Sequence, residues 1–182
     1  MKGIKEKRKI AFRYHGNERE MIVSPYYLVI CIGRYYMLCN TKGKENISQY
    51  RLDRMNAVRV LESGSTKIED LQELDDIIFD VERYIMQHPR MSTGKIVTAN
   101  LIVERNYIEA VQAEFFVEMI QPYNQSYYQV RIRSTRTAIC NWVINMPGKV
   151  IVENDYGGGV IDLLCEKAKE VLSIYDDNYG QV

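Results

Sequence analysis

The sequence holds little of what catalysis or metal binding requires. It contains 2 His and 4 Cys in 182 residues, with no Cys-x-x-Cys pair and no nucleophile or zinc-protease motif. No run of about 20 apolar residues is present, so the sequence predicts no membrane span. The N-terminus is too polar for a secretory signal, which favours a cytoplasmic protein. We therefore expect no enzyme, no cofactor, no metal and no membrane partner.

The four cysteines are spread over the whole chain. Cys31 and Cys39 fall in strand-like apolar runs, and Cys140 and Cys165 fall in helix-like ones. Free cysteine prefers protein interiors, and thiols stay reduced in the cytosol. The sequence therefore predicts four buried, reduced thiols.

A net charge of zero hides an uneven distribution of charge along the chain. Residues 1–61 hold 13 Lys and Arg against 5 Asp and Glu, whereas residues 62–182 hold 11 against 19. Such asymmetry favours an anionic partner for the basic part. Alternatively, the two parts balance each other within the chain or across a dimer contact, and charge alone does not decide between the two.

Strand patterns dominate the basic part. Ile10, Phe12 and Tyr14 alternate with polar residues, as in a half-buried strand. Pro25 predicts a break in the ladder where the next strand starts, and Gly33 predicts a tight turn. Five or six short strands are predicted, the last two over residues 49–54 and 57–61. Because their connections are too short for crossover helices, they predict a small antiparallel barrel.

The rest of the chain changes character. Residues 63–95 are predicted as a linker in which Thr66 caps a helix that runs to the His88-Pro89 pair, with Asp75-Asp76 on its solvated face. Residues 96–182 follow a β-α-β-β-α-β order with an added helix, which is typical of a ferredoxin-like α+β domain. The predicted domains are therefore 1–62, 63–95 and 96–182.

Three segments carry a resemblance to a known family: Val23-Ser24-Pro25-Tyr26-Tyr27-Leu28, Gly33-Arg34-Tyr35-Tyr36-Met37-Leu38 and Tyr50-Arg51-Leu52-Asp53-Arg54-Met55. In this order they resemble the WYL domain, whose Trp-Tyr-Leu triplet reads Tyr35-Tyr36-Met37 here. WYL domains are sensor modules of bacterial transcription regulators. The resemblance implies an SH3- or Sm-like barrel, and weaker matches at residues 84–94 and 137–152 imply the C-terminal extension that follows it.

Arg51 and Arg54 are the central candidates for contact with an anion. A planar guanidinium binds phosphate or carboxylate through two parallel, charge-assisted hydrogen bonds. The alternative is a surface ion pair of either arginine with Asp53 or Glu62, which contributes little to stability. The resemblance favours the ligand contact.

Tyrosine is the second unusual feature, with 14 Tyr against 4 Phe. Tyrosine can stack on a base and can donate a hydrogen bond to phosphate, but it also packs well on half-buried strands. The family's motif positions single out Tyr26 and Tyr36, with Tyr35 beside them. The family's pockets also use Ser and His, which adds Ser24 and His15. Both of these are otherwise interpreted as turn residues.

We predict a ligand-sensing and oligomerisation module of a bacterial transcription regulator. Its effector is predicted to be anionic, either a nucleotide or a short single-stranded nucleic acid, and the module is predicted to form a homodimer. In the family, DNA is bound by an upstream helix-turn-helix, which this sequence lacks, so the chain is either a fragment or a stand-alone sensor. The alternatives are a constitutive dimerisation or protein-interaction module without a ligand, and direct binding of RNA by the barrel.

Overall fold

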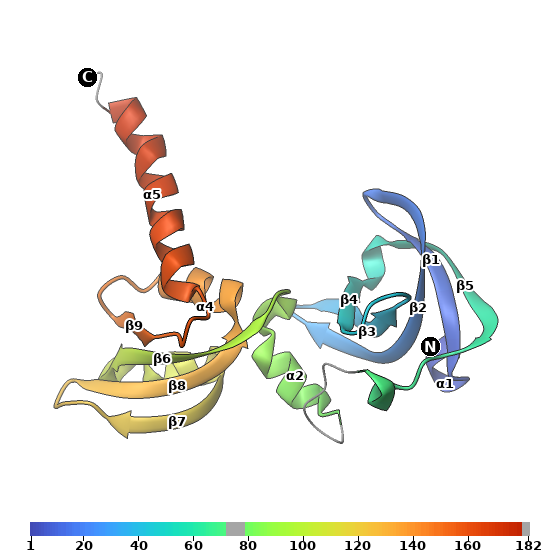
Figure 1. The fold of residues 1–182 in the computed structure, drawn as a ribbon, viewed down its shortest axis with the longest axis horizontal. Coiled ribbons are helices and arrows are strands. Elements are labelled where there is room, and N and C mark those ends of the chain that lie inside the picture. Colours follow the sequence, from blue (N-terminus) through green and yellow to red (C-terminus); the bar gives the residue numbers. More distant parts are fainter. Residues whose placement is uncertain (72–78, 180–182) are drawn as a thin grey trace. The chain divides into compact units, whose positions relative to one another are not determined.

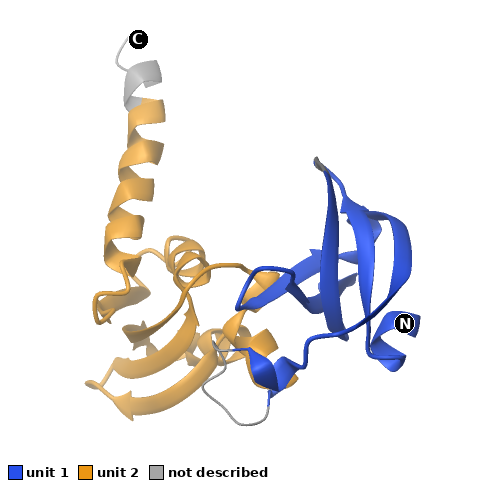
Figure 2. Cartoon of the chain, turned by 45° about the vertical axis from the view of Figure 1, so that its right-hand side comes forward, with its two compact units in different colours: residues 1–80 blue, residues 81–182 orange. Residues whose placement is uncertain are grey.

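The computed structural model describes residues 1–71 and 79–179, without the side chains of residues 17–18 and 176–179. The chain divides into two compact units, residues 1–80 and 81–182, which are blue and orange in Figure 2. Each unit contains one antiparallel sheet. The finer division at residues 62 and 95 stays a prediction. No helix in the described ranges is long and apolar enough to cross a membrane.

The first unit contains a five-stranded antiparallel sheet of order β4-β3-β2-β1-β5 (Figure 1). Ile10 and Phe12 of β1 are buried, as their alternation with polar residues predicts. The ring of Phe12 meets that of Tyr50 edge to face, with centroids 5.2 Å apart. The elements are α1 (Lys2–Lys5), β1 (Arg8–Tyr14), β2 (Asn17–Cys31), β3 (Arg34–Thr41), β4 (Ile47–Arg51), the 3-10 turn η1 (Leu52–Arg54), β5 (Met55–Gly64) and the 3-10 turn η2 (Ile68–Asp70).

Pro25 does not end a strand, contrary to the prediction. Strand β2 runs without a break from Asn17 to Cys31, and its pairing with β3 shifts register between Pro25 and Tyr27. A bulge tolerates proline because the extra residue there needs no ladder hydrogen bond. The sheet therefore keeps one long strand where the sequence predicted two.

The helix predicted from Thr66 is also wrong at its start. The short turn η2 has Lys67 rather than Thr66 as its N-cap, and the backbone N–H of Thr66 donates to Ser24 Oγ at 3.0 Å. The turn η2 ends at Leu71, which is extended with ψ of 126° and is buried. The helix α2 (Val81–Gln87) begins in the second unit. The predicted middle of the helix, including Asp75-Asp76, lies outside the described residues.

The second unit contains a four-stranded antiparallel sheet of order β7-β8-β6-β9 (Figure 1). Its core includes Leu101 and Ile132 from the sheet, Ile139 from a covering helix and Phe115. Thr135 caps α4, since its hydroxyl accepts the Ala138 N–H at 3.2 Å. After α2, the elements are η3 (Pro89–Met91), β6 (Ile96–Glu104), η4 (Arg105–Tyr107), α3 (Ile108–Glu114), β7 (Phe116–Pro122), β8 (Tyr127–Thr135), α4 (Arg136–Val143), β9 (Val150–Asn154) and α5 (Val160–Tyr179).

The cysteines are free thiols, but only two of the four are buried. Cys39 and Cys140 are buried, and loss of hydration raises the pKa of both. Cys31 is half-buried and Cys165 is exposed. The prediction of four buried thiols is wrong for these two, because Cys165 lies on a side of α5 that its own unit leaves uncovered.

Candidate functional site

Arg51 ends strand β4 directly beside Tyr36 of β3. The two residues are partners in the antiparallel ladder, and Val29 of β2 pairs with Tyr36 on its other side. Partners in such a ladder project from the same face of the sheet. The sheet thus brings together two of the predicted site residues, an aromatic ring and a guanidinium, which are 15 positions apart in sequence.

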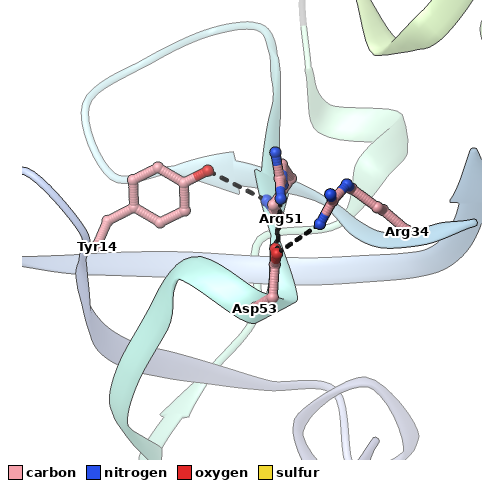
Figure 3. A network of polar contacts seen from close by, with 4 residues as sticks. All are labelled: Tyr14, Arg34, Arg51 and Asp53. Atoms are coloured by element: carbon pink, nitrogen blue, oxygen red, sulfur yellow. Dashed lines mark hydrogen bonds and ion pairs between the residues drawn. The ribbon is translucent and has the colours of Figure 1, made fainter. Parts of the chain in front are cut away.

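The guanidinium of Arg51 is held by Asp53. Arg51 Nε donates to Asp53 Oδ1 at 3.0 Å, and Arg51 Nη2 donates to Oδ2 at 2.6 Å. Arg34 Nη1 donates to the same Oδ2 at 3.1 Å, so one carboxylate bridges two arginines (Figure 3). The turn η1 folds the chain back immediately after β4 and thereby places Asp53 against Arg51. The ion pair with Asp53, one of the two predicted alternatives, is present.

The charges of this network are strongly coupled. The hydrogen bond from Arg51 and the positive charges of Arg51 and Arg34 lower the pKa of Asp53. The hydrogen bond to Asp53 correspondingly raises the pKa of Arg51. Two guanidinium groups against one carboxylate leave a net charge of about +1 across the ordinary pH range. The side chain of Arg51 is 21% exposed, so the pair is accessible to a solute.

Tyr14 completes the network from strand β1. The backbone N–H of Arg51 donates to the Tyr14 hydroxyl oxygen at 3.3 Å (Figure 3). The ring of Tyr14 packs edge to face on Tyr50, with centroids 5.0 Å apart. Tyr14 therefore fixes the end of β4, and with it the point from which the Arg51 side chain leaves the sheet.

Arg34 was not among the predicted site residues, although the sequence holds a signal for it. It follows the two-residue turn Ile32-Gly33, in which both residues have positive φ, 48° and 66°. Arg34 and Tyr36 are two positions apart on β3, so they share a face of the sheet. That alternation would have placed Arg34 beside Tyr36, whereas its closeness to Arg51 depends on the pairing of β3 with β4.

The remaining predicted residues lie in four other places. His15 and Arg54 are joined through the backbone, because the His15 N–H donates to the Arg54 carbonyl at 2.9 Å, and both side chains are exposed. No hydrogen bond or ion pair of the Arg54 guanidinium is present within the part of the chain that the structure describes. Tyr35 is 57% exposed and projects from the face opposite to Tyr36.

Ser24 lines a pocket of about 270 Å³ on another part of the first unit. Ser24 and Asn40 are ladder partners and form its buried wall. Asn40 Nδ2 donates to the carbonyl oxygens of Lys44 and Asn46 at 2.7 and 3.2 Å, which holds the loop that carries the rim. The pocket is lined by Lys9, Ile22, Val23, Ser24, Asn40, Lys42, Gly43, Lys44, Glu45, Thr66, Asp70 and Leu71.

Tyr26 is neither part of the arginine network nor one of the residues that line the pocket, although the charge of Asp70 in that lining acts on it. Its hydroxyl is buried and has no hydrogen-bond partner within the described residues. Burial, with a smaller contribution from the neighbouring Cys39, raises the pKa of Tyr26 to about 12. A hydroxyl without solvent and without a partner is poorly placed to meet an effector.

Tyr26→Phe is therefore expected to leave the free energy of unfolding unchanged or to raise it by up to about 1 kcal/mol, because it removes an unsatisfied polar group. Urea unfolding monitored by tyrosine fluorescence and circular dichroism measures this. The variant should also bind effector as the wild type does. A loss of stability above about 1 kcal/mol, or a weaker affinity, would show that the hydroxyl has a partner that the structure does not record.

Metal chemistry has no obvious location in the described ranges. Among residues 1–71 and 79–179, no group of three or more His, Cys, Asp and Glu side chains is placed to hold a metal ion. His88 is buried in the second unit, where its Nδ1 donates to the Tyr84 carbonyl at 2.8 Å. Burial lowers the pKa of His88, which favours the neutral ring.

Comparisons with known proteins give a family for the first unit and a fold for the whole chain. The WYL domain model matches residues 1–60. No curated protein matches the chain. A solved structure described as a CRISPR Cas-related protein has a TM-score of 0.61 at 14% identity, over 97% of this chain and 50% of its own length. Proteasome accessory factor B/C (PafBC) of Arthrobacter aurescens has a TM-score of 0.39 at 19% identity, over 84% of this chain and 23% of its own length. The chain thus spans half or less of the length of these two proteins.

Proposed function

Because the chain carries a WYL domain in residues 1–60, we propose that it is the effector-sensing module of a bacterial transcription regulator. The proposed effector is anionic, either a nucleotide or a short single-stranded nucleic acid. It contacts Arg51 and Arg34, stacks on Tyr36 and approaches Arg54. DNA is bound by a helix-turn-helix outside this chain, and the module acts as a homodimer.

The observation that carries this proposal is the pair of hydrogen bonds from the Arg51 guanidinium to the carboxylate of Asp53. A guanidinium that already holds two carboxylate oxygens at 2.6 and 3.0 Å presents the geometry that two phosphate oxygens require. The second arginine on Asp53 leaves the network with a net positive charge. Tyr36, the cross-strand partner of Arg51, supplies a ring beside the anion, as in proteins that stack bases next to a bound backbone.

Regulation then follows from a difference in affinity. An effector shifts the regulator only by as much as it binds one conformation more tightly than another. An anion that replaces Asp53 releases η1 from Arg51 and Arg34, which alters the link between β4 and β5. The proposed two states are therefore Asp53 bound to the arginines and Asp53 displaced.

Two finer statements on the fold belong to the same proposal. We assign the five-stranded first unit to the SH3- or Sm-like barrels, on the strength of its short connections and antiparallel neighbours. We assign the second unit to the ferredoxin-like α+β fold, because β6-α3-β7-β8-α4-β9 has the order that this fold requires.

The test is binding of labelled short single-stranded DNA and RNA, measured by fluorescence polarisation at two salt concentrations. Arg51→Ala/Arg54→Ala is expected to weaken binding at least about tenfold and to flatten its salt dependence, since charge-assisted contacts are lost. Lys42→Ala/Lys44→Ala is the matched control, because it removes the same charge from the pocket rim of the same unit.

The Lys42→Ala/Lys44→Ala control distinguishes binding at a specific site from general electrostatic attraction. Equal weakening by both double variants would mean that the oligonucleotide responds only to net charge. Loss in the lysine variant alone would move the site to the pocket that Ser24 lines. If folded wild-type protein binds no oligonucleotide, the same pair of variants is compared for binding of nucleoside triphosphates by calorimetry. No binding there either would leave the ligand-free dimerisation module as the function.

A further inference from the structure

The first half of helix α5 packs against its own unit. Val160 is fully buried, and Leu164 packs against the core of the second unit. Lys167 Nζ donates to Asn141 Oδ1 of α4 at 2.8 Å. Every side chain from residue 168 to residue 175 is exposed. The second half of the helix extends beyond the sheet of its unit (Figure 1).

An apolar stripe runs along the exposed side of this helix. Ile161, Cys165, Ala168 and Leu172 follow one another at intervals of four, three and four residues, and all are exposed. This is the spacing at which one helix packs against another over successive turns. Ile161 is 39% exposed and Leu172 is 60% exposed, whereas a helix that faces only water carries polar residues on that side.

Two opposite charges flank the stripe at matching positions. Asp162 directly follows Ile161, and Lys169 directly follows Ala168. When two such helices lie antiparallel with Cys165 opposite Ala168 of the second copy, Ile161 lies opposite its Leu172. In that register Asp162 lies beside Lys169 of the second copy, and the two-fold symmetry repeats the pair. A parallel arrangement would instead place both charges beside Leu164 and Val171.

We propose that α5 is a self-association surface, which pairs antiparallel with α5 of a second copy through Ile161, Cys165, Ala168 and Leu172. This rests on the homodimer in the proposed function, to which it gives a surface and a register, but it does not depend on effector binding. The pairing covers about three turns of each helix, less than the roughly 800 Å² per partner of a standard interface. The α5 pair alone therefore forms a dimer that dissociates on dilution.

The experiment is sedimentation velocity of the full chain over a range of concentrations, under reducing conditions. Leu172→Asp is expected to raise the dimer dissociation constant about 10- to 100-fold, because it places a charge against Ile161 of the second copy at both ends of the interface. Ile151→Asp is the control, since it adds the same charge at a side chain of β9 that is 56% exposed. It should leave the dissociation constant unchanged.

Charge reversal tests the register itself. Asp162→Lys and Lys169→Asp are each expected to weaken the dimer, and the double variant is expected to restore it. Asp162 is in the first turn of α5, where an acidic residue favours the helix, so circular dichroism accompanies each variant. The double variant keeps any such cost, so its recovery cannot come from helix stability.

Three results would overturn the proposal. If Leu172→Asp leaves the dimer dissociation constant unchanged, the interface lies elsewhere, and only the homodimer is supported. A double charge variant no better than the single ones rejects the antiparallel register. Wild-type protein that is monomeric at every concentration rejects both the surface and the homodimer, while the oligonucleotide experiment still decides effector binding.

Discussion

Phe115→Ala should lower the free energy of unfolding of the second unit by about 3–5 kcal/mol. Phe115 is 1% exposed and connects α3 to β7 in the centre of the core. Its ring meets that of Trp142 edge to face, with centroids 5.4 Å apart, so truncation removes both buried area and an aromatic pair. Because strands and a helix surround it on all sides, the site cannot collapse to fill the cavity. Urea denaturation followed by Trp142 fluorescence measures the change.

Ile120→Ala in the same unit is the control for Phe115. It truncates an apolar side chain that is 36% exposed, so it should cost less than about 1 kcal/mol. A similar loss in the two variants would mean that Phe115 is not enclosed as described. The first unit should keep its own stability in both, which tyrosine signals from its sheet can report.

We expect the second large effect from Asn40→Asp, which should lower the free energy of unfolding of the first unit by about 3 kcal/mol at neutral pH. It changes one atom of a side chain that is 6% exposed. The Asn40 amide donates to the carbonyl oxygens of Lys44 and Asn46, whereas a carboxylate would place negative charge against both. An introduced charge that is buried without a donor costs more than a lost hydrogen bond. Chemical denaturation at pH 7 provides the measurement.

The pH dependence of the Asn40→Asp variant identifies the cause. Repulsion and burial raise the pKa of the introduced carboxyl above its value of about 4 in the unfolded chain. Its destabilisation is therefore full above the raised pKa and fades as the pH falls through it, because the protonated acid can donate again. Asn46→Asp makes the same change at an exposed residue and should be nearly neutral. If the loss of unfolding free energy in Asn40→Asp does not decrease as the pH falls, the charge of the introduced carboxylate is not its cause.

The alternation of apolar and polar residues predicted most of the strands, because it reflects which side chains of a strand are buried. Ile10 and Phe12 alternate with polar residues, since one face of β1 meets the core. The start of the helix predicted from Thr66 is wrong for a non-local reason. Leu71 has helical spacing from Ile68, but it packs into the pocket beside Ser24, and Thr66 is held by the Ser24 hydroxyl. Contacts 42 residues apart in sequence outweighed a weak local preference.

The sequence predicted which residues belong to the candidate site better than it predicted how they are arranged. The sequence offered an ion pair with Asp53 as one alternative for Arg51, and the two side chains are bonded. The role of Arg34 depends on the pairing of β3 with β4, which the sequence does not state. Ser24 was grouped with Arg51 through motif order, yet the structure places it in a separate pocket. Motif residues that follow one another in sequence need not share a site.

Asp53 imposes a competition on any ligand of the arginines. Its carboxylate is tethered two residues from Arg51, so its effective concentration at the fork far exceeds that of a free monovalent anion. Acetate or chloride would thus be excluded at cellular concentrations. A ligand with several charges can hold Arg51 and Arg34 at once and offset the displaced carboxylate. In the proposed sensor, Asp53 would therefore favour ligands with several negative charges over simple monovalent anions.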